Sequence, residues 1–204
     1  EMQDAVNQQR TIEKGLREAL ANNEFELYFQ GQYDADNQLV GAETLLRWNH
    51  PERGVIAPGE FIDVAEQTGL IVPIGDWVLR SACEQLTALQ DGLKLAVNVS
   101  PRQFGDSAFV DNLKKVLLET GADPRLLTLE ITEGLAMANI RQSIDSMNEL
   151  KKLGISFSVD DFGTGYSSLS YLHQLPIDEL KIDQSFVRNI SNSTENEVIV
   201  DTII

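Results

Sequence analysis

The sequence predicts an α/β fold in which a mostly parallel sheet closes into a barrel. Segments with the pattern of strands alternate along the chain with segments of helical periodicity, which is typical of repeated β/α units. Five strand segments also carry their polar side chains on one face, with charge near the carboxyl end. In an open parallel sheet, helices cover both faces and both must be apolar, so a single polar face favours a barrel.

The elements are expected in a regular order after an N-terminal helix. Residues 1–23 are polar with apolar residues at helical spacing, which predicts either a linker helix that follows an upstream domain or a mostly solvated terminal helix. The folded domain then covers residues 24–204. Its strand-like runs, in which apolar and polar residues alternate, are 25–30, 40–48, 93–100, 126–132, 155–162 and 179–183. Helical patterns lie between them at 58–67, 74–89, 107–120, 140–153 and 167–172, and glycines or prolines mark several joints.

Composition indicates an acidic globular protein and excludes several kinds of site. The 204 residues allow a sizeable core, and the net charge of −16 argues against binding to DNA or RNA, which needs a basic surface. The single cysteine, Cys83, excludes an internal disulfide and falls on an apolar helix face, so we expect it in the core. With only His50 and His173, a multi-histidine metal site is not expected. No segment has the ~20 apolar residues of a membrane span, so we expect a cytoplasmic chain, alone or as the cytoplasmic part of a membrane-anchored protein.

A set of oxygen ligands can be read from the polar faces of the strands. These residues are Glu43, Asn98, Glu130 and Asp160, with Asp161 next in sequence. A set without histidine or thiolate favours Mg²⁺ or Mn²⁺ over zinc or copper. Such ions would also neutralise the adjacent carboxylates of Asp160 and Asp161, which otherwise repel each other. Because consecutive strand residues point to opposite faces, we expect the chain to turn after Asp161, where the glycines of residues 162–165 allow it.

Lys181 lies on the same polar face and supplies a positive charge. We expect it to orient a metal-bound water; a structural salt bridge to Asp183 or Asp160 is the alternative. From the chemistry alone, Glu43 and Glu130 could instead be the acid and the base or nucleophile of a glycosidase. That hypothesis leaves the other polar residues of the set without a role.

Eight short motifs occur in order along residues 18–204. They are Leu-Tyr-Phe-Gln, Glu-Thr-Leu-Leu-Arg-Trp, Asn-His-Pro, Pro-Gly-Glu-Phe-Ile, Val-Asn-Val-Ser, Leu-Glu-Ile-Thr-Glu, Asp-Asp-Phe-Gly-Thr-Gly-Tyr-Ser-Ser-Leu and Leu-Lys-Ile-Asp. With these motifs the sequence resembles the EAL-domain family of cyclic di-GMP phosphodiesterases. The resemblance implies a modified (β/α) TIM-like barrel with an antiparallel first strand. It also implies a bacterial signalling hydrolase that converts cyclic di-GMP to linear pGpG by two-metal-ion cleavage.

The resemblance also implies a role for each candidate residue. The ligands of one Mg²⁺ or Mn²⁺ ion are Glu43, Asn98, Glu130 and Asp160, and Asp160 with Asp161 serves a second ion. Lys181 positions the attacking water, and Glu133 braces the loop 162–168, which in the family couples dimerisation to metal binding. The implied contacts to substrate are Arg47, which suits a phosphate group, and Gln30, Leu46 and Asp183.

Three features depart from the family pattern. Thr44 stands where the family signature has alanine, on the face turned to the helices, and Gly31 stands where proline is usual. The family pattern continues with two further β/α units after the point where this chain ends at Ile204. The barrel is therefore expected to be C-terminally incomplete and this piece weakly active or inactive.

The implied partners are cyclic di-GMP, a second copy in a homodimer, and an upstream sensor or GGDEF-type domain. The alternative to an active enzyme is a catalytically silent cyclic di-GMP receptor. Silent members typically lose metal ligands, whereas those visible here are intact.

Overall fold

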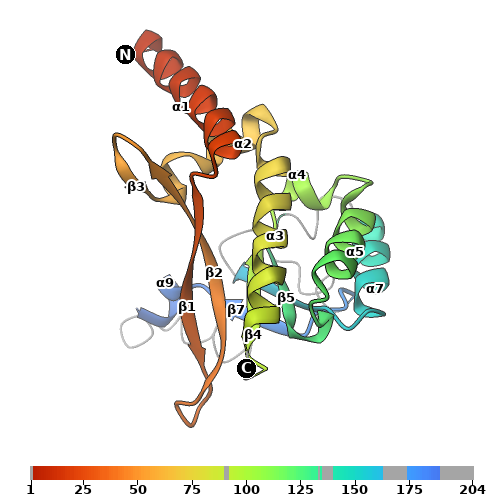
Figure 1. Ribbon diagram of the computed structural model, residues 1–204. Helices are drawn as coiled ribbons and strands as arrows, with labels where there is room; N and C mark the ends of the chain where they lie inside the picture. Colours follow the sequence, from red (N-terminus) through yellow and green to blue (C-terminus); the bar gives the residue numbers. More distant parts are fainter. Residues whose placement is uncertain (1, 90–91, 133, 135–139, 163–173, 189–204) are drawn as a thin grey trace.

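The computed structural model describes residues 2–89, 92–132, 134, 140–162 and 174–188, and its centre is a seven-stranded sheet (Figure 1). The strands are β1 (Phe25–Tyr33), β2 (Leu39–His50), β3 (Gly54–Ile56), β4 (Lys94–Asn98), β5 (Leu127–Thr132), β6 (Ser156–Phe162) and β7 (Glu179–Ile182). Their order is β1-β2-β4-β5-β6-β7, with β3 paired to β2. β1 is antiparallel to β2, and from β2 to β7 this path is parallel, in agreement with the predicted topology.

Helices connect the parallel strands. They are α1 (Met2–Asn22), α2 (Ile62–Thr68), α3 (Ile71–Ala88), α4 (Pro101–Phe104), α5 (Phe109–Thr120), α7 (Ile140–Lys151) and α9 (Gln184–Arg188), with 3₁₀ turns η1 (Pro58–Glu60) and η2 (Pro124–Leu126). The sequence pattern does not predict β3, α4 or α9, because elements this short show no period. The expected helix at 167–172 lies outside the described residues.

Local sequence explains where several helices begin and end. Ser100 caps α4, since its hydroxyl accepts a hydrogen bond from the backbone N–H of Gln103 at 3.1 Å, and Pro101 occupies the first turn, where no N–H is needed. α2 and α5 end at Gly69 and Gly121, which have φ values of 80° and 72°. This left-handed conformation favours glycine and stops each helix at that residue.

The hydrophobic core lies between the sheet and the helices packed on its outer face. Figure 1 shows α3, α5 and α7 side by side on this face. Leu129 of β5, Phe157 of β6 and Met147 of α7 are fully buried there. Cys83 of α3 is also fully buried, which confirms its predicted place in the core.

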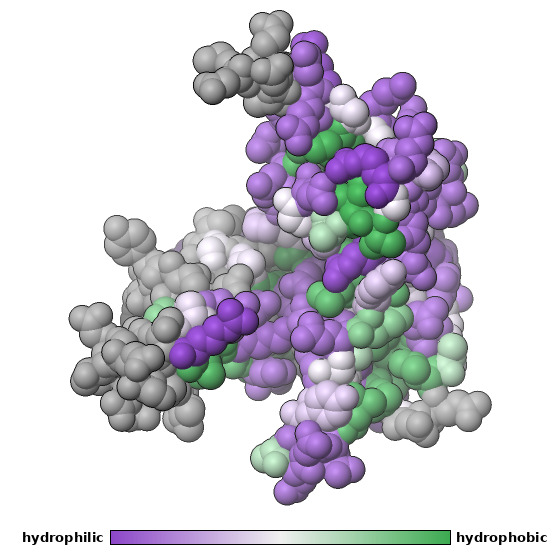
Figure 2. Space-filling view, turned by 90° about the vertical axis from the view of Figure 1, so that its left-hand side faces the viewer, coloured by the Kyte–Doolittle hydropathy of each residue, from purple (hydrophilic) through white to green (hydrophobic). Residues whose placement is uncertain are grey.

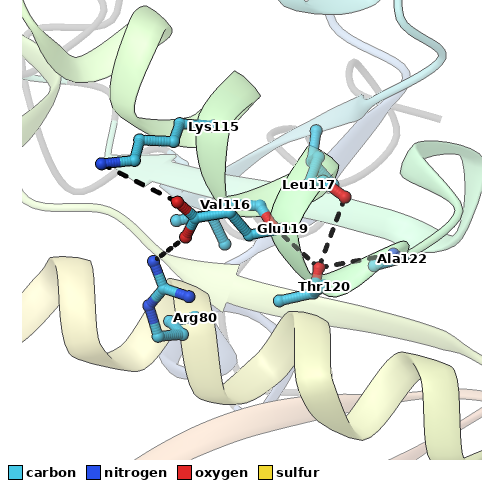
Figure 3. A network of polar contacts seen from close by, with 7 residues as sticks. All are labelled: Arg80, Lys115, Val116, Leu117, Glu119, Thr120 and Ala122. Carbon is cyan, nitrogen blue, oxygen red and sulfur yellow. Dashed lines mark hydrogen bonds and ion pairs between the residues drawn. The ribbon is translucent and has the colours of Figure 1, made fainter.

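A surface ion pair joins α3 to α5 (Figure 3). The Glu119 carboxylate lies 2.6 Å from Arg80 of α3 and 3.8 Å from Lys115 of its own helix. The hydrogen bond from Arg80 lowers the pKa of Glu119. At the next residue, the Thr120 hydroxyl donates a hydrogen bond to the Val116 carbonyl at 2.8 Å. This carbonyl, in the last turn of α5, thereby gains a side-chain partner.

The β1–β2 hairpin carries much of the exposed hydrophobic surface. Figure 2 views the molecule from the side of this hairpin and shows hydrophobic patches among mostly polar residues. The large exposed side chains on the two strands are Tyr28, Phe29, Tyr33, Leu39 and Val40. Among the described residues, no helix is both long enough and apolar enough to cross a lipid bilayer.

Candidate metal centre

The site is built on one face of five neighbouring strands. Its residues are Glu43 on β2, Asn98 on β4, Glu130 on β5, Asp160 on β6 and Lys181 on β7. Asn98 is paired in register with Glu130, and Glu130 with Ser158. Because strand side chains alternate, this register turns all five residues to the same side of the sheet.

Three carboxylates meet at this place. Glu43, Glu130 and Asp160 each offer an oxygen atom, and these atoms lie within 4.8 Å of one another. Lys181 lies among them: its Nζ is 3.0 Å from Glu43 Oε2 and 3.9 Å from Asp160 Oδ2, and it is in contact with Glu130 Oε1. Three carboxylates facing one ammonium group leave an excess of negative charge.

Asn98 orients one of the carboxylates. Its Nδ2 donates a hydrogen bond to Glu43 Oε1 at 2.9 Å, while Lys181 donates to Glu43 Oε2 at 3.0 Å. Glu43 is therefore held through both oxygens by side chains from β4 and β7. This fixed orientation is what a carboxylate needs if it is to bind a metal ion reproducibly.

Glu130 is the most buried member, with 1% of its surface exposed. Burial raises the pKa of Glu130 to about 7, the hydrogen bond and charge of Lys181 oppose this shift, and repulsion from Glu43 and Asp160 adds to it. Burial also disfavours the charged form of Lys181, but Glu130 and Glu43 outweigh it, so the pKa of Lys181 is raised. The lysine is thus held protonated beside carboxylates that repel one another.

The donor set fits a hard divalent cation. In the described part of the chain, the buried oxygens without a hydrogen-bond partner include Glu130 Oε2 and Ser158 Oγ. Buried polar atoms normally have a partner, so these two are available to a ligand or water. Converging carboxylates with excess negative charge are the environment that Mg²⁺ and Mn²⁺ prefer in proteins.

The strand that carries Asp160 and Asp161 ends where the sequence predicts its end. β6 runs to Phe162, and its pairing with β7 shifts register between Val159 and Phe162. An irregularity of this kind re-aims side chains without ending the strand. The side chain of Asp161 and the glycines at 163 and 165 lie outside the described residues.

Two residues expected to contact the phosphate or the ligand, Gln30 and Arg47, lie on the β1–β2 hairpin. Gln30 of β1 is exposed and is paired in register with Glu43. The Arg47 guanidinium lies over the Tyr28 ring, 5.4 Å from its centroid, and donates to the Leu46 carbonyl at 2.8 Å. Tyr28 is a neighbour that strand alternation alone did not single out.

Two other residues expected to contact the ligand, Leu46 and Asp183, make contacts within the protein. Leu46 lies on the face of β2 opposite Glu43 and packs against the core. Asp183 accepts a hydrogen bond from the backbone N–H of Ser185 at 2.9 Å at the start of α9, and its hydrogen bonds with Ser185 lower its pKa. Glu133 and most of the loop 162–168 lie outside the described residues.

A cavity of about 800 Å³ borders the cluster. Glu43, Lys181 and Gln30 line it together with Lys94 and Asp178, which the polar-face argument did not select. Asp178 lies two positions after Pro176 and just before β7, and a proline near the start of a strand is the sequence signal for it.

Comparisons with known proteins give a consistent result. The EAL domain family matches residues 13–204. The chain is 43% identical over 194 residues to the bifunctional diguanylate cyclase/cyclic di-GMP phosphodiesterase MucR of Pseudomonas aeruginosa, covering 93% of this chain and 28% of that protein. It is 41% identical to the cyclic di-GMP phosphodiesterase NbdA of the same organism, covering 98% of this chain and 26% of NbdA. The chain thus spans about a quarter of the length of these relatives. A solved structure of the PaMucR phosphodiesterase in complex with c-di-GMP matches with a TM-score of 0.89 at 41% identity, over 95% of this chain and 80% of that one.

Proposed function

The chain belongs to the EAL domain family, and we propose on this basis that it hydrolyses cyclic di-GMP to linear pGpG. The likeness to solved EAL domains confirms the predicted TIM-like α/β barrel class. Relatives named as cyclic di-GMP phosphodiesterases support the substrate. The observation that carries the proposal is the cluster of Glu43, Glu130 and Asp160 around Lys181, because an enzyme of this class needs a hard-metal site at this position.

The metal site that we propose holds two Mg²⁺ or Mn²⁺ ions. The ligands of the first ion would be Glu43, Asn98, Glu130 and Asp160, and the second would be shared by Asp160 and Asp161. Ions bound there would activate a water molecule and offset the negative charge that develops on the phosphodiester.

The chain's own side chains would position the other reactants. Lys181 is protonated, lies between Glu43 and Glu130, and can donate a hydrogen bond that orients the attacking water. The Arg47 guanidinium, held over Tyr28, would bind a phosphate oxygen. Gln30, Leu46 and Asp183 would contact the nucleotide, and Glu133 would brace the loop that follows β6.

The setting that we propose is a larger cytoplasmic signalling protein. MucR, of which the match covers 28%, is named as bifunctional, which supports a neighbouring GGDEF-type or sensor domain here. Residues 1–23 would be the linker helix and residues 24–204 part of the phosphodiesterase domain. A homodimer is the expected assembly.

The test is hydrolysis of cyclic di-GMP by the natural full-length protein with Mg²⁺ or Mn²⁺, monitored as formation of pGpG. We expect turnover that chelation by EDTA abolishes and that Glu43→Ala reduces by about a hundredfold or more. Glu52→Ala, an exposed carboxylate on the β2–β3 turn, is the matched control and should keep wild-type turnover. Calorimetric binding of cyclic di-GMP without any turnover would identify the silent receptor instead.

A further inference from the structure

We propose that Asp178 is a positioning residue that sets the placement of Lys181 and Asp160, an inference that rests on the proposed function. Asp178 lies immediately before β7 and bonds to a single residue of β6, Phe157, through both its backbone and its side chain. Its N–H donates to the Phe157 carbonyl at 2.8 Å, and its Oδ2 accepts from the Phe157 N–H at 2.9 Å. We call this pair of hydrogen bonds the Asp178 clamp.

The clamp replaces part of a normal strand ladder. In a parallel pair, the N–H and C=O of one residue bond to two backbone groups of the neighbouring strand. Here the Asp178 N–H satisfies the Phe157 carbonyl as a strand would, but the carboxylate takes the place of the second backbone group. β7 begins at Glu179, and the side chain of the residue before it supplies the acceptor for the Phe157 N–H.

Phe157 is a firm anchor for the clamp. Its side chain is fully buried and packs edge-on against the Phe104 ring, with 6.3 Å between the ring centroids. The other oxygen of Asp178, Oδ1, accepts from Lys151 of α7 at 2.5 Å. The clamp ties the start of β7 to a core residue of β6, and the separate ion pair with Lys151 ties it to the helix that precedes β6.

The clamp matters because β7 is short and its pairing with β6 is irregular. This strand has four residues, and only Ser158–Glu179 and Val159–Leu180 are paired before the register shifts. Asp178 precedes Lys181 by three residues, as Phe157 precedes Asp160. A slip of one residue would turn Lys181 to the other face of the sheet, away from Glu43 and Glu130. Smaller displacements would change the distance of 3.9 Å between Lys181 Nζ and Asp160 Oδ2.

Asp178→Leu tests the clamp because it keeps the branching at Cγ and removes the acceptor. The carboxylate side chain is 42% exposed, so the substitution opens no cavity in the core. We expect kcat for cyclic di-GMP hydrolysis by the full-length protein to fall by roughly 10- to 100-fold with KM changed less than about threefold, and Mn²⁺ affinity to fall in parallel. Asp178→Asn keeps an oxygen that can accept from Phe157 and should stay within about threefold of wild type.

Two controls separate positioning from stability. Lys151→Met removes the ion pair and leaves the clamp in place, so it should retain kcat. Leu113→Ala destabilises the core at a remote site on α5 and should lower the Tm at least as much as Asp178→Leu while keeping kcat below that Tm. Equal kcat and Mn²⁺ affinity in Asp178→Leu and wild type would overturn the proposal, as would an equal loss of kcat in Leu113→Ala.

Amide hydrogen exchange at Phe157 tests the clamp independently of the chemistry. Exchange should be faster in Asp178→Leu and unchanged in Asp178→Asn. If the wild-type protein shows no hydrolysis, the proposed function fails. Mn²⁺ affinity and the exchange rate at Phe157 would still decide the role of Asp178. Unchanged values in Asp178→Leu would refute that role, and weaker Mn²⁺ binding together with faster exchange would support it.

Discussion

Glu130 is the most deeply buried residue of the metal site. Burial and the neighbouring carboxylates raise its pKa from an ordinary 4.5 to about 7. In the absence of metal, the folded chain therefore binds this proton more tightly than the unfolded chain does. The resulting stability is present below the ordinary pKa and is lost as pH rises towards 7.

Replacing Glu130 by glutamine should stabilise the metal-free protein at neutral and higher pH. In EDTA at about pH 8, we expect the free energy of unfolding of Glu130→Gln to exceed that of wild type by roughly 1–3 kcal/mol, measured by urea denaturation. The difference should shrink as the pH falls and vanish well below the ordinary pKa of 4.5, where wild-type Glu130 is protonated in both states. Glu119→Gln is the control: Arg80 lowers the pKa of Glu119, so this variant should gain no stability at the higher pH. A Glu130→Gln protein less stable than wild type under these conditions would contradict the assignment.

Cys83 should be chemically silent in the native protein. It is fully buried, and burial raises its pKa to about 11, so very little thiolate exists near neutral pH. A thiol reagent such as Ellman's reagent should label none of the native chain and label it stoichiometrically in urea. Fast labelling under native conditions would show that α3 opens more readily than its packing indicates.

At the scale of elements, α3 and α4 meet at a position that tolerates only glycine. A Cβ atom on Gly75 would lie 2.2 Å from Gln103 Oε1 and 2.4 Å from its Cδ. Gln103 is itself 2% exposed, so its side chain has little space to move.

Gly75→Ala should therefore destabilise the fold although alanine favours helices. We expect overpacking to cost about 1–3 kcal/mol, more than the gain of about 1 kcal/mol in helix propensity. Chemical denaturation of Gly75→Ala, Gln103→Ala and the double variant measures the coupling, and Gln103→Ala should relieve most of the clash. Gly59→Ala, whose Cβ would meet nothing within 4 Å, is the control. Simple additivity of the two single changes would refute the contact.

Sequence pattern and structure agree best where an element is long. Strands β2, β5 and β6 could be predicted from alternation, and that same alternation brought Glu43, Glu130 and Asp160 to one face. Helices such as α7 follow from their apolar periodicity. Short elements such as β3 could not be predicted, because three residues cannot display a period.

The role of a residue that acts through contacts between neighbouring strands also cannot be predicted from the sequence. Asp178 becomes significant only when β6 and β7 are neighbours, since its partner Phe157 lies 21 positions away. The contact of Arg47 with Tyr28 depends in the same way on the pairing of β1 with β2. Alternation assigns a side chain to a face, but it does not say which neighbour that side chain contacts.

For the whole molecule, a net charge of −16 and a converging carboxylate cluster predict stabilisation by divalent cations. Mg²⁺ or Mn²⁺ should raise the Tm more than KCl of equal ionic strength, because binding to the folded state adds to general screening. At about 100 times the Kd, the gain would be about 2.7 kcal/mol. The excess over KCl should disappear in a Glu43→Gln, Glu130→Gln double variant and persist in Glu119→Gln. An equal response to both salts would indicate screening alone.

The close approach of α1 to β2 has an optical consequence. Gly15 of α1 lies against the Trp48 ring, since a Cβ there would come within 2.6 Å of it, and the indole N–H donates to Glu24 at 3.0 Å. Trp48 and Trp77 both lie within 6.5 Å of the Phe25 ring, centre to centre, and they are the two tryptophans of the chain. Tryptophan fluorescence therefore reports on the region around Phe25, where α1 meets β2. Its emission maximum would shift if the N-terminal helix undocked, even while the far side of the sheet stays folded.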